Sequence, residues 1–244
     1  MPSVELICLA NSYKLNYRCV AGLHVDGGGW VRPVSDKEHG ALQYSQYRLP
    51  DHSEPHLFDV IRVGLSCPRP LPHQPENWLV DDSPWMLLER PAPAEFARVV
   101  SSAVCGGPAL LGDTARAVRQ AQFRSRPARH SLTLIKPANL RWRTEFNTYQ
   151  LRNVPRVLFD LGDVRYDLPL TDPAYAGSLQ RRDEGDYQSS DLGIREDSTV
   201  LLTISLSEPY NGICYKLVAG VVVLPPRWAA QLSDTSNINI GALT

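Results

Sequence analysis

Arginine is the residue type whose spacing in this sequence could do the most chemistry. Between residues 115 and 165 the chain carries eleven Lys or Arg side chains against three carboxylates, a local net charge of +8. Most of these basic residues are Arg, whose planar guanidinium group pairs with phosphate and stacks on nucleobases. Aromatic residues occur in the same stretch, namely Phe123, Trp142, Phe146 and Tyr149. This combination of charge and rings favours a surface that binds single-stranded nucleic acid.

Two of these arginines flank a tryptophan in an alternating pattern. Arg141 and Arg143 lie on either side of Trp142, and apolar and polar residues continue to alternate through residue 146. Alternation predicts a half-buried strand, so we expect Trp142 in the core and both arginines on the surface. We therefore predict that Arg141 and Arg143 contact nucleic acid. The alternative is a solvated basic face without a ligand.

A second pair of Trp and Arg lies near the N-terminus. Trp30 and Arg32 are two residues apart in a segment with the composition of a strand. Residues two apart in a strand face the same side of the sheet. On an exposed face, Trp30 could stack on a base while Arg32 holds a phosphate. The alternative is that Trp30 belongs to the core and that Arg32 pairs with Asp36 or Glu38.

A polar loop stiffened by prolines supplies a third group of candidates. It contains Gln74, Glu76, Asn77 and Trp78. The amides and the carboxylate can form hydrogen bonds with the edge of a base or with a small ligand. The alternative is that these polar groups cap a turn and anchor Trp78.

Three further polar side chains complete the candidate set: Asn11, Arg18 and Lys216. Together with Arg32 and the loop residues, they could line a polar pocket for a nucleotide or another small ligand. The protein would then be a nucleotide-directed enzyme or a receptor. We expect a deep polar pocket if this second interpretation holds, and dispersed, exposed positions if it does not.

Motifs of catalysis are incomplete. There is no P-loop and no Gly-x-Ser-x-Gly segment, and the glycines at 27–29 lack the spacing of a dinucleotide fingerprint. His52 and Glu54 match the first half of a deaminase signature whose Pro-Cys-x-x-Cys half is missing. Pro55 disfavours the helix that would bring His52 and His56 to one metal ion. We therefore predict no catalytic residues, no metal site and no cofactor.

The net charge of the whole chain conceals the basic segment. Its 244 residues include 25 Lys or Arg and 26 Asp or Glu, for a formal net charge of −1. The balance arises because residues 172–198 carry seven acids against three arginines. The apolar fraction is ordinary for a globular protein, and no apolar run reaches the length of a membrane span. Five scattered cysteines without a CxxC pair predict free thiols in a reducing, cytoplasmic compartment.

The periodicity of apolar residues predicts strands towards both ends of the chain and helices only in the middle. Expected strands cover residues 4–10, 18–25, 29–34, 57–65, 132–135, 140–146, 157–161, 164–168, 200–206 and 214–224. Expected helices cover residues 93–104 and 113–123, the second with Asp113 as its N-cap. Residues 174–198 are polar and acidic and predict a long loop or insertion.

This order of elements predicts a mainly β protein with a short helical middle, folded as two OB-like small β-barrels. The phrase Val20-Ala21-Gly22 is repeated at Val218-Ala219-Gly220, in keeping with two related halves. We place an N-terminal barrel with a helical extension at residues 1–112. A C-terminal barrel with the acidic insertion follows at residues 113–224, and residues 225–244 are expected to form a tail.

Several short phrases spread from residue 6 to about residue 222 carry a resemblance to a known family. They lie at residues 9–12, 18–22, 30–35, 74–78, 171–173, 205–209 and 215–219. As a set they resemble the bacterial proteins described as dual OB domain-containing. The resemblance implies two OB-like barrels and a nucleic-acid-binding role, and it brings no catalytic residues with it. The basic stretch at 115–165 lies outside these phrases.

The sequence leaves three interpretations open. The favoured one is a non-catalytic protein that binds single-stranded DNA or RNA through its barrel faces and the basic segment. The second is the nucleotide or small-ligand enzyme or receptor described above. The third is a subunit of a larger complex, in which the acidic and basic segments dock a protein partner. None of the three involves a membrane.

Overall fold

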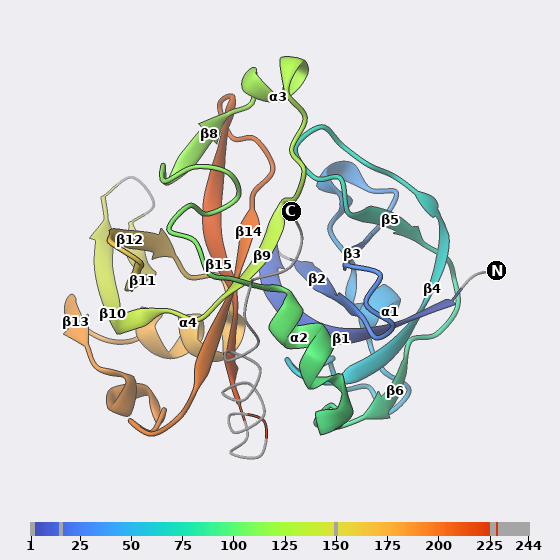
Figure 1. Cartoon of the computed structure of the whole chain (residues 1–244), viewed down its shortest axis with the longest axis horizontal. Coiled ribbons are helices and arrows are strands. Elements are labelled where there is room, and N and C mark those ends of the chain that lie inside the picture. Colours follow the sequence, from blue (N-terminus) through green and yellow to red (C-terminus); the bar gives the residue numbers. More distant parts are fainter. Residues whose placement is uncertain (1–2, 15–16, 149–150, 225–227, 229–244) are drawn as a thin grey trace, which may run out of the picture.

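The computed structural model describes residues 3–14, 17–148, 151–224 and 228. In this part of the chain, two β-rich halves stand side by side and meet along their central strands (Figure 1). The N-terminal half is drawn in blue and teal, and the C-terminal half in yellow, orange and red. The predicted mainly β fold is confirmed.

The N-terminal half is a closed five-stranded barrel of the OB type. Its strands are β1 (Ser3–Lys14), β2 (Tyr17–His24), β3 (Trp30–Val34), β4 (Val60–Pro68) and β5 (Asn77–Val80). They follow the order β1-β2-β3-β5-β4, and pairing of β1 with β4 closes the ring. A further strand, β6 (Met86–Glu89), pairs with β4. The turn between β2 and β3 depends on Gly27 and Gly29, both at positive φ.

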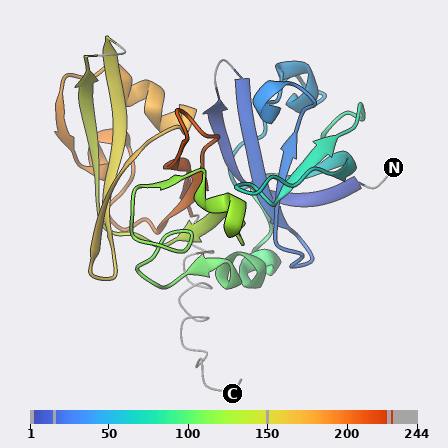
Figure 2. The same ribbon diagram turned by 90° about the horizontal axis from the view of Figure 1, so that it is seen from above.

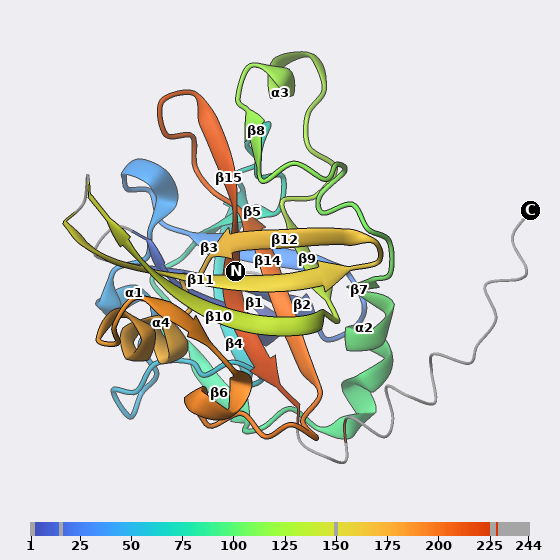
Figure 3. The ribbon, with the colours of Figure 1, turned by 90° about the vertical axis from the view of Figure 1, so that its left-hand side faces the viewer.

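The C-terminal half is an open half-barrel built from two sheets. One sheet has the order β7-β9-β14-β15-β8, and the other has the order β12-β11-β10-β13. Their strands are β7 (Val104–Cys105), β8 (Ala117–Arg119), β9 (Leu132–Ile135), β10 (Ala138–Asn147), β11 (Arg152–Leu161), β12 (Val164–Pro169), β13 (Gly185–Tyr187), β14 (Val200–Leu206) and β15 (Ile213–Val223). Figure 3 shows β10, β11 and β12 side by side. The OB-like character of both halves agrees with the prediction.

Short helices connect these strands. They are η1 (Glu38–Gly40), α1 (Tyr44–Tyr47), η2 (Ala94–Phe96), α2 (Ala97–Ser102), α3 (Gln122–Ser125), α4 (Pro173–Gln180) and η3 (Ser189–Leu192). The predicted helix at 93–104 corresponds to η2 and α2 together. No helix in the described ranges is long and apolar enough to cross a membrane.

The halves are joined along a seam in which β1 lies against β14 and β15. The Thr203 hydroxyl of β14 donates a hydrogen bond to the Leu9 carbonyl of β1 at 2.6 Å. A Cβ atom built at Gly220 of β15 would lie only 2.3 Å from the same carbonyl oxygen. Glycine permits this approach because it has no side chain. The repeated phrase noted in the sequence thus ends, in its second copy, on a glycine that the seam requires.

One apolar core crosses the seam. Ile7 and Leu9 of the first half are buried in the same cluster as Leu134, Leu201 and Val222 of the second half. Strand β7, which precedes residue 112, pairs in parallel with β9 of the C-terminal half. The C-terminal sheet therefore includes chain from before the expected boundary at residue 112.

The predicted helix at 113–123 is wrong. Asp113 accepts a hydrogen bond from the Ala115 N–H in a tight turn, and residues 117–119 form β8 instead. Strand β8 pairs with residues 213–215 of β15 and buries Val118. Pairing and burial outweigh the local helix propensity here, as tertiary contacts commonly do. Helix is found only at α3, at the end of the predicted range.

The predicted long loop at 174–198 is also wrong. Asp172 caps α4, strand β13 pairs with β10, and Ile194 is buried. The buried residues are too widely spaced in this polar segment to show a period. The predicted tail at 225–244 lies outside the described residues, except for Trp228. That side chain is buried and donates its indole N–H to the Ala92 carbonyl at 3.0 Å.

We predict that Gly220→Ala destabilises the protein by about 1–3 kcal/mol, because the added methyl group must displace β1 from β15. Thermal or urea unfolding measures the effect. Gly107→Ala is the matched control, because a Cβ atom there meets open space, and its stability should be unchanged or slightly raised. Equal stability of the two variants would contradict the tight seam.

A second prediction concerns Asp172, which lies beside the seam and accepts hydrogen bonds from Ala174 N–H and Val221 N–H. Burial raises the pKa of this carboxyl group from 3.8 to about 6. The folded state therefore binds the proton more tightly than the unfolded chain, so ionisation costs stability as the pH rises from about 4 to 6. The cost is about 3 kcal/mol.

Chemical unfolding of the wild type and of Asp172→Asn across this pH range tests the prediction. The amide cannot ionise, so the wild type should lose stability relative to the variant as the pH rises. A stability difference that is independent of pH would show that Asp172 does not titrate in this range.

Candidate nucleic-acid interface

Arg32 lies inside the protein, at the seam, and not on an exposed sheet face. Its side chain is 0% exposed. The guanidinium group donates to Asn77 Oδ1 at 3.3 Å within its own barrel and to Ser205 Oγ of β14 at 3.1 Å across the seam. The expectation of an exposed Trp30–Arg32 face is therefore wrong for Arg32. Its partners are also not the two carboxylates considered in the sequence but neutral oxygens.

The polar loop after β4 belongs to the same buried network. Gln74 donates to the Leu206 carbonyl at 3.0 Å and accepts from Asn77 at 3.3 Å. The Glu76 carboxylate accepts from the backbone N–H and the hydroxyl of Ser131, both at 2.6 Å. Each of these contacts to Leu206 and Ser131 joins the N-terminal barrel to the C-terminal half. The loop residues therefore stabilise the seam, and their polar groups already form hydrogen bonds within it.

The seam also covers the side of the first barrel on which OB folds commonly bind ligands. In such barrels, strands β2 and β3 form the ligand face. Here Ala21 of β2 is buried against Leu132 and Ala219 of the C-terminal half. With Arg32 of β3 also buried, much of this face is occupied by the protein itself. Trp30, at the start of β3, and Trp78, on β5, remain half-buried.

Asn11 and Arg18 lie together on the N-terminal barrel. Arg18 forms a bidentate ion pair with Glu54 at 2.9 and 3.2 Å and places its guanidinium carbon 4.5 Å from the centre of the Tyr13 ring. Asn11 donates to the Pro55 carbonyl at 2.9 Å. The ion pair anchors the loop that precedes β4. The guanidinium group of Arg18 therefore already has a partner within the protein.

Lys216 stands apart from this group. Its side chain is fully buried and its ammonium donates to the backbone carbonyl and the carboxylate of Asp113 at 2.9 and 2.6 Å. Burial lowers the pKa of Lys216. The seven polar candidates of the small-ligand interpretation therefore do not converge on one pocket, and none of them lines either of the two cavities named below.

Arg141 and Arg143 differ in how far their charges are neutralised. Arg143 forms a bidentate ion pair with Asp186 at 2.6 and 3.0 Å, and this pair lowers the pKa of the Asp186 carboxyl. Arg141 is exposed and has no such pair in the described part of the chain. Both border a small cavity of about 210 Å³ that Asp186 also lines. The acidic insertion thus neutralises part of the basic stretch, which sequence reasoning did not anticipate.

The unneutralised part of the basic stretch lies elsewhere, in the segment 114–130, which we call the arginine arm. From residue 114 to residue 136 the chain holds six Lys or Arg and no Asp or Glu. The arm comprises β8, α3 and the turns around them, and it lies over the junction of the two halves (Figures 1 and 2). A backbone hydrogen bond of 2.8 Å from Ala128 to the Pro72 carbonyl ties it to the first barrel.

Four arginines project from this arm without a partner among the described residues. They are Arg119, Arg124, Arg126 and Arg129, all of them exposed. The underside of the arm is apolar, since Val118 and Phe123 pack against Leu206 and Cys214. Burial of one side fixes the arm, and the arginines are left on the other side facing solvent.

Two exposed tyrosines lie next to the arm on the β14–β15 hairpin. Tyr210 at its tip is 70% exposed, and Tyr215 on β15 is 39% exposed. Tyr215 pairs directly with Ala117 of β8, so its ring and Arg119 share the outer face of this sheet. Figure 3 shows α3 and the hairpin at the same end of the molecule. The absence of acidic residues from 114 to 136 could have indicated the arm from the sequence alone. No sequence pattern indicated the two tyrosines.

No group of three or more His, Cys, Asp or Glu side chains converges on a possible metal position in the described ranges. On the arginine arm and the hairpin beside it, unpaired positive charge and exposed rings coincide, and this surface lies beside the seam between two OB-like halves.

Comparison with known families agrees with this architecture. No curated protein matches the chain. The model of the dual OB-containing domain family matches residues 4–221. This match covers most of the chain, including the N-terminal barrel, the C-terminal half-barrel and the seam between them. The protein therefore belongs to the dual OB-containing domain family.

Proposed function

We propose that this protein binds single-stranded DNA or RNA along the arginine arm and the neighbouring β14–β15 hairpin, and that it does so without catalysis. The observation that carries the proposal is the set of four exposed arginines that have no partner in the described ranges, on a segment that contains no carboxylate. Arginines in ion pairs would lose those pairs on binding phosphate, whereas these four are already available.

The aromatic residues support a single strand over a duplex. Tyr210 and Tyr215 expose their rings beside the arginines, and bases can stack on such rings only when they are unpaired. Positive charge that follows the backbone, together with rings that accept any base, gives affinity with little sequence preference.

The arrangement differs from that of an isolated OB barrel. In the first barrel, the common ligand face on β2 and β3 is occupied by the seam, as the buried Arg32 and Ala21 show. A strand therefore has access to the edge of the seam and not to the part of that face around Arg32 and Ala21. The five free cysteines support a reducing, cytoplasmic location as part of the same proposal.

We predict that the triple variant Arg124→Gln, Arg126→Gln, Arg129→Gln binds a short labelled oligothymidylate at least tenfold more weakly than the wild type at low salt. Each lost phosphate contact should also lower the slope of log affinity against log salt by about 0.7, so the triple variant should lose about 2. Fluorescence anisotropy titrations at several salt concentrations measure both quantities.

The matched control removes the same charge from elsewhere. Arg62, Arg165 and Arg195 are exposed and each is paired with a carboxylate. Replacing all three by Gln should leave the affinity and the slope nearly unchanged. If both triple variants lose the same affinity, net charge determines binding and the arm has no special role. If the wild type does not bind at low salt, the proposed function is excluded.

The contribution of stacking is measured separately with Tyr210→Ala. Because no charge is lost, affinity should fall at every salt concentration while the slope stays constant. Tyr44→Ala, which removes a tyrosine that is 45% exposed on the first barrel, is the control and should bind as the wild type does.

A further inference from the structure

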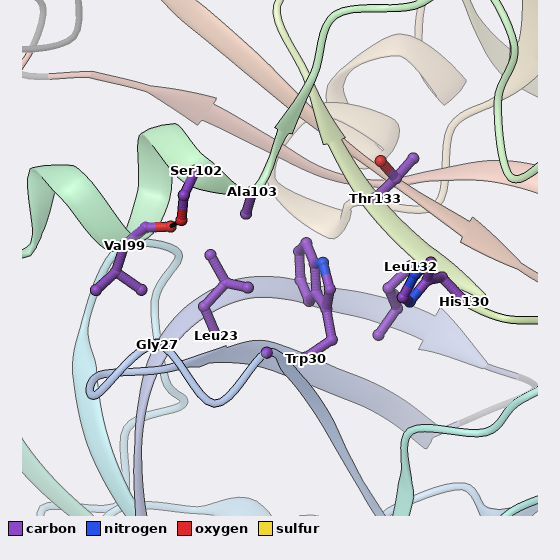
Figure 4. Close-up of a pocket in the computed structure, with 10 residues that line it drawn as sticks. Leu23, Gly27, Trp30, Val99, Ser102, Ala103, His130, Leu132 and Thr133 are labelled. Atoms are coloured by element: carbon purple, nitrogen blue, oxygen red, sulfur yellow. Dashed lines mark hydrogen bonds between the residues drawn. The ribbon is translucent and has the colours of Figure 1, made fainter. Parts of the chain in front are cut away.

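A cavity of about 330 Å³ lies where the turn after β2, helix α2 and strand β9 approach one another (Figure 4). Trp30, Leu23 and Leu132 line it, and in this view Trp30 lies between the two leucines. Val99 of α2 and Ala103, the C-cap of α2, form a further part of the wall. The volume is at the lower end of the range for small-molecule sites, which is roughly 300–1,000 Å³. A single planar ring system would suit it.

Three side chains around this cavity have polar groups that are available to bind a ligand. The indole N–H of Trp30, the hydroxyl of Thr133 and the ring nitrogens of His130 form no hydrogen bond with another residue in the ranges that the structure describes. No carboxylate lines the cavity. An aromatic wall with hydrogen-bond donors and acceptors at its edge, and without a carboxylate, matches a heteroaromatic ring better than a cation.

The cavity is continuous with the arginine arm. Arg129 is the last arginine of the arm, and His130 directly follows it and lines the cavity. A strand whose phosphates follow the arm as far as Arg129 would therefore have a base next to His130, at the edge of the cavity. Single-stranded substrates can turn one base out of the stack into such a pocket at little cost, because no base pair has to open.

We propose that this cavity receives one nucleobase of the strand bound to the arginine arm, with the base stacked on Trp30 and its edge held by Thr133 and His130. The inference rests on the proposed function and adds to it a site for base recognition. It assigns to Trp30 the stacking role that the sequence indicated, at a different place from the buried Arg32.

The test uses the full chain and an oligothymidylate that contains one 2-aminopurine, whose fluorescence is quenched by stacking. The wild type should quench it. Trp30→Leu removes the stacking ring, and Ala103→Phe fills the cavity from the C-terminal end of α2. Each should relieve most of the quenching and weaken strand binding roughly tenfold, without changing the salt slope, since no phosphate contact is lost.

Leu151→Phe is the control for an added aromatic ring, because Leu151 is 77% exposed and lies outside the cavity. It should quench and bind as the wild type does. Unchanged quenching in both Trp30→Leu and Ala103→Phe would overturn the inference while arm-dependent strand binding persists. Loss of strand binding in the wild type would instead remove the proposed function itself.

A free mononucleotide distinguishes the two sources of a base. If the base comes from a bound strand, thymidine monophosphate should bind far more weakly than the strand. Binding of the mononucleotide as tight as that of the strand, and unaffected by the arm variants, would show a nucleotide receptor and contradict the assignment.

Discussion

The contact between the Leu9 carbonyl and Gly220 is the constraint on which the rest of the structure depends. With the Thr203 hydroxyl bonded to the same oxygen at 2.6 Å, it brings β1 against β14 and β15 and forms the seam between the two halves. Because β1 lies so close to β14 and β15, side chains from both halves bury each other, and one apolar core includes Ile7 and Val222. Tight packing of this kind leaves little room for independent movement of the halves.

The seam explains where a ligand can and cannot bind. A buried guanidinium group is costly unless it forms hydrogen bonds. The two terminal nitrogens of Arg32 donate to groups from both halves, Asn77 and Ser205, while its Nε has no partner among the described residues. Separating the halves to expose this face would take Ser205 away from Arg32 and Ser131 away from Glu76. The protein therefore uses its first OB face for internal contact, and the free charge lies at the edge, on the arginine arm.

The phrases that carry the family resemblance take on a structural meaning from the same contacts. Arg32, Gln74 and Ser205 belong to three different phrases, and they meet in one hydrogen-bonded network. The phrase at 171–173 supplies Asp172, whose carboxylate accepts the Val221 N–H of β15. Arg32 and Gln74, which the sequence marked as candidate ligand contacts, form contacts between the halves.

Most strands were predictable, because alternation of apolar residues reports burial directly. The 132–135 strand and the 157–168 hairpin are found where the pattern indicated. Strand β8 was not predictable, since Val118 becomes buried only when β15 pairs with it. The neutralisation of Arg143 by Asp186, 43 residues away, and the burial of Arg32 by Ser205, 173 residues away, depend likewise on tertiary contacts that no local pattern shows.

Hydrogen–deuterium exchange of the full chain, with and without a short oligothymidylate, separates binding at the arginine arm from binding at the OB face. We expect protection on binding at residues 116–133 and 207–215. We expect no change at residues 31–34 and 74–77, which are already protected inside the seam. New protection confined to β2 and β3, with none in the arginine arm, would show that the strand binds the OB face after all and would contradict the account.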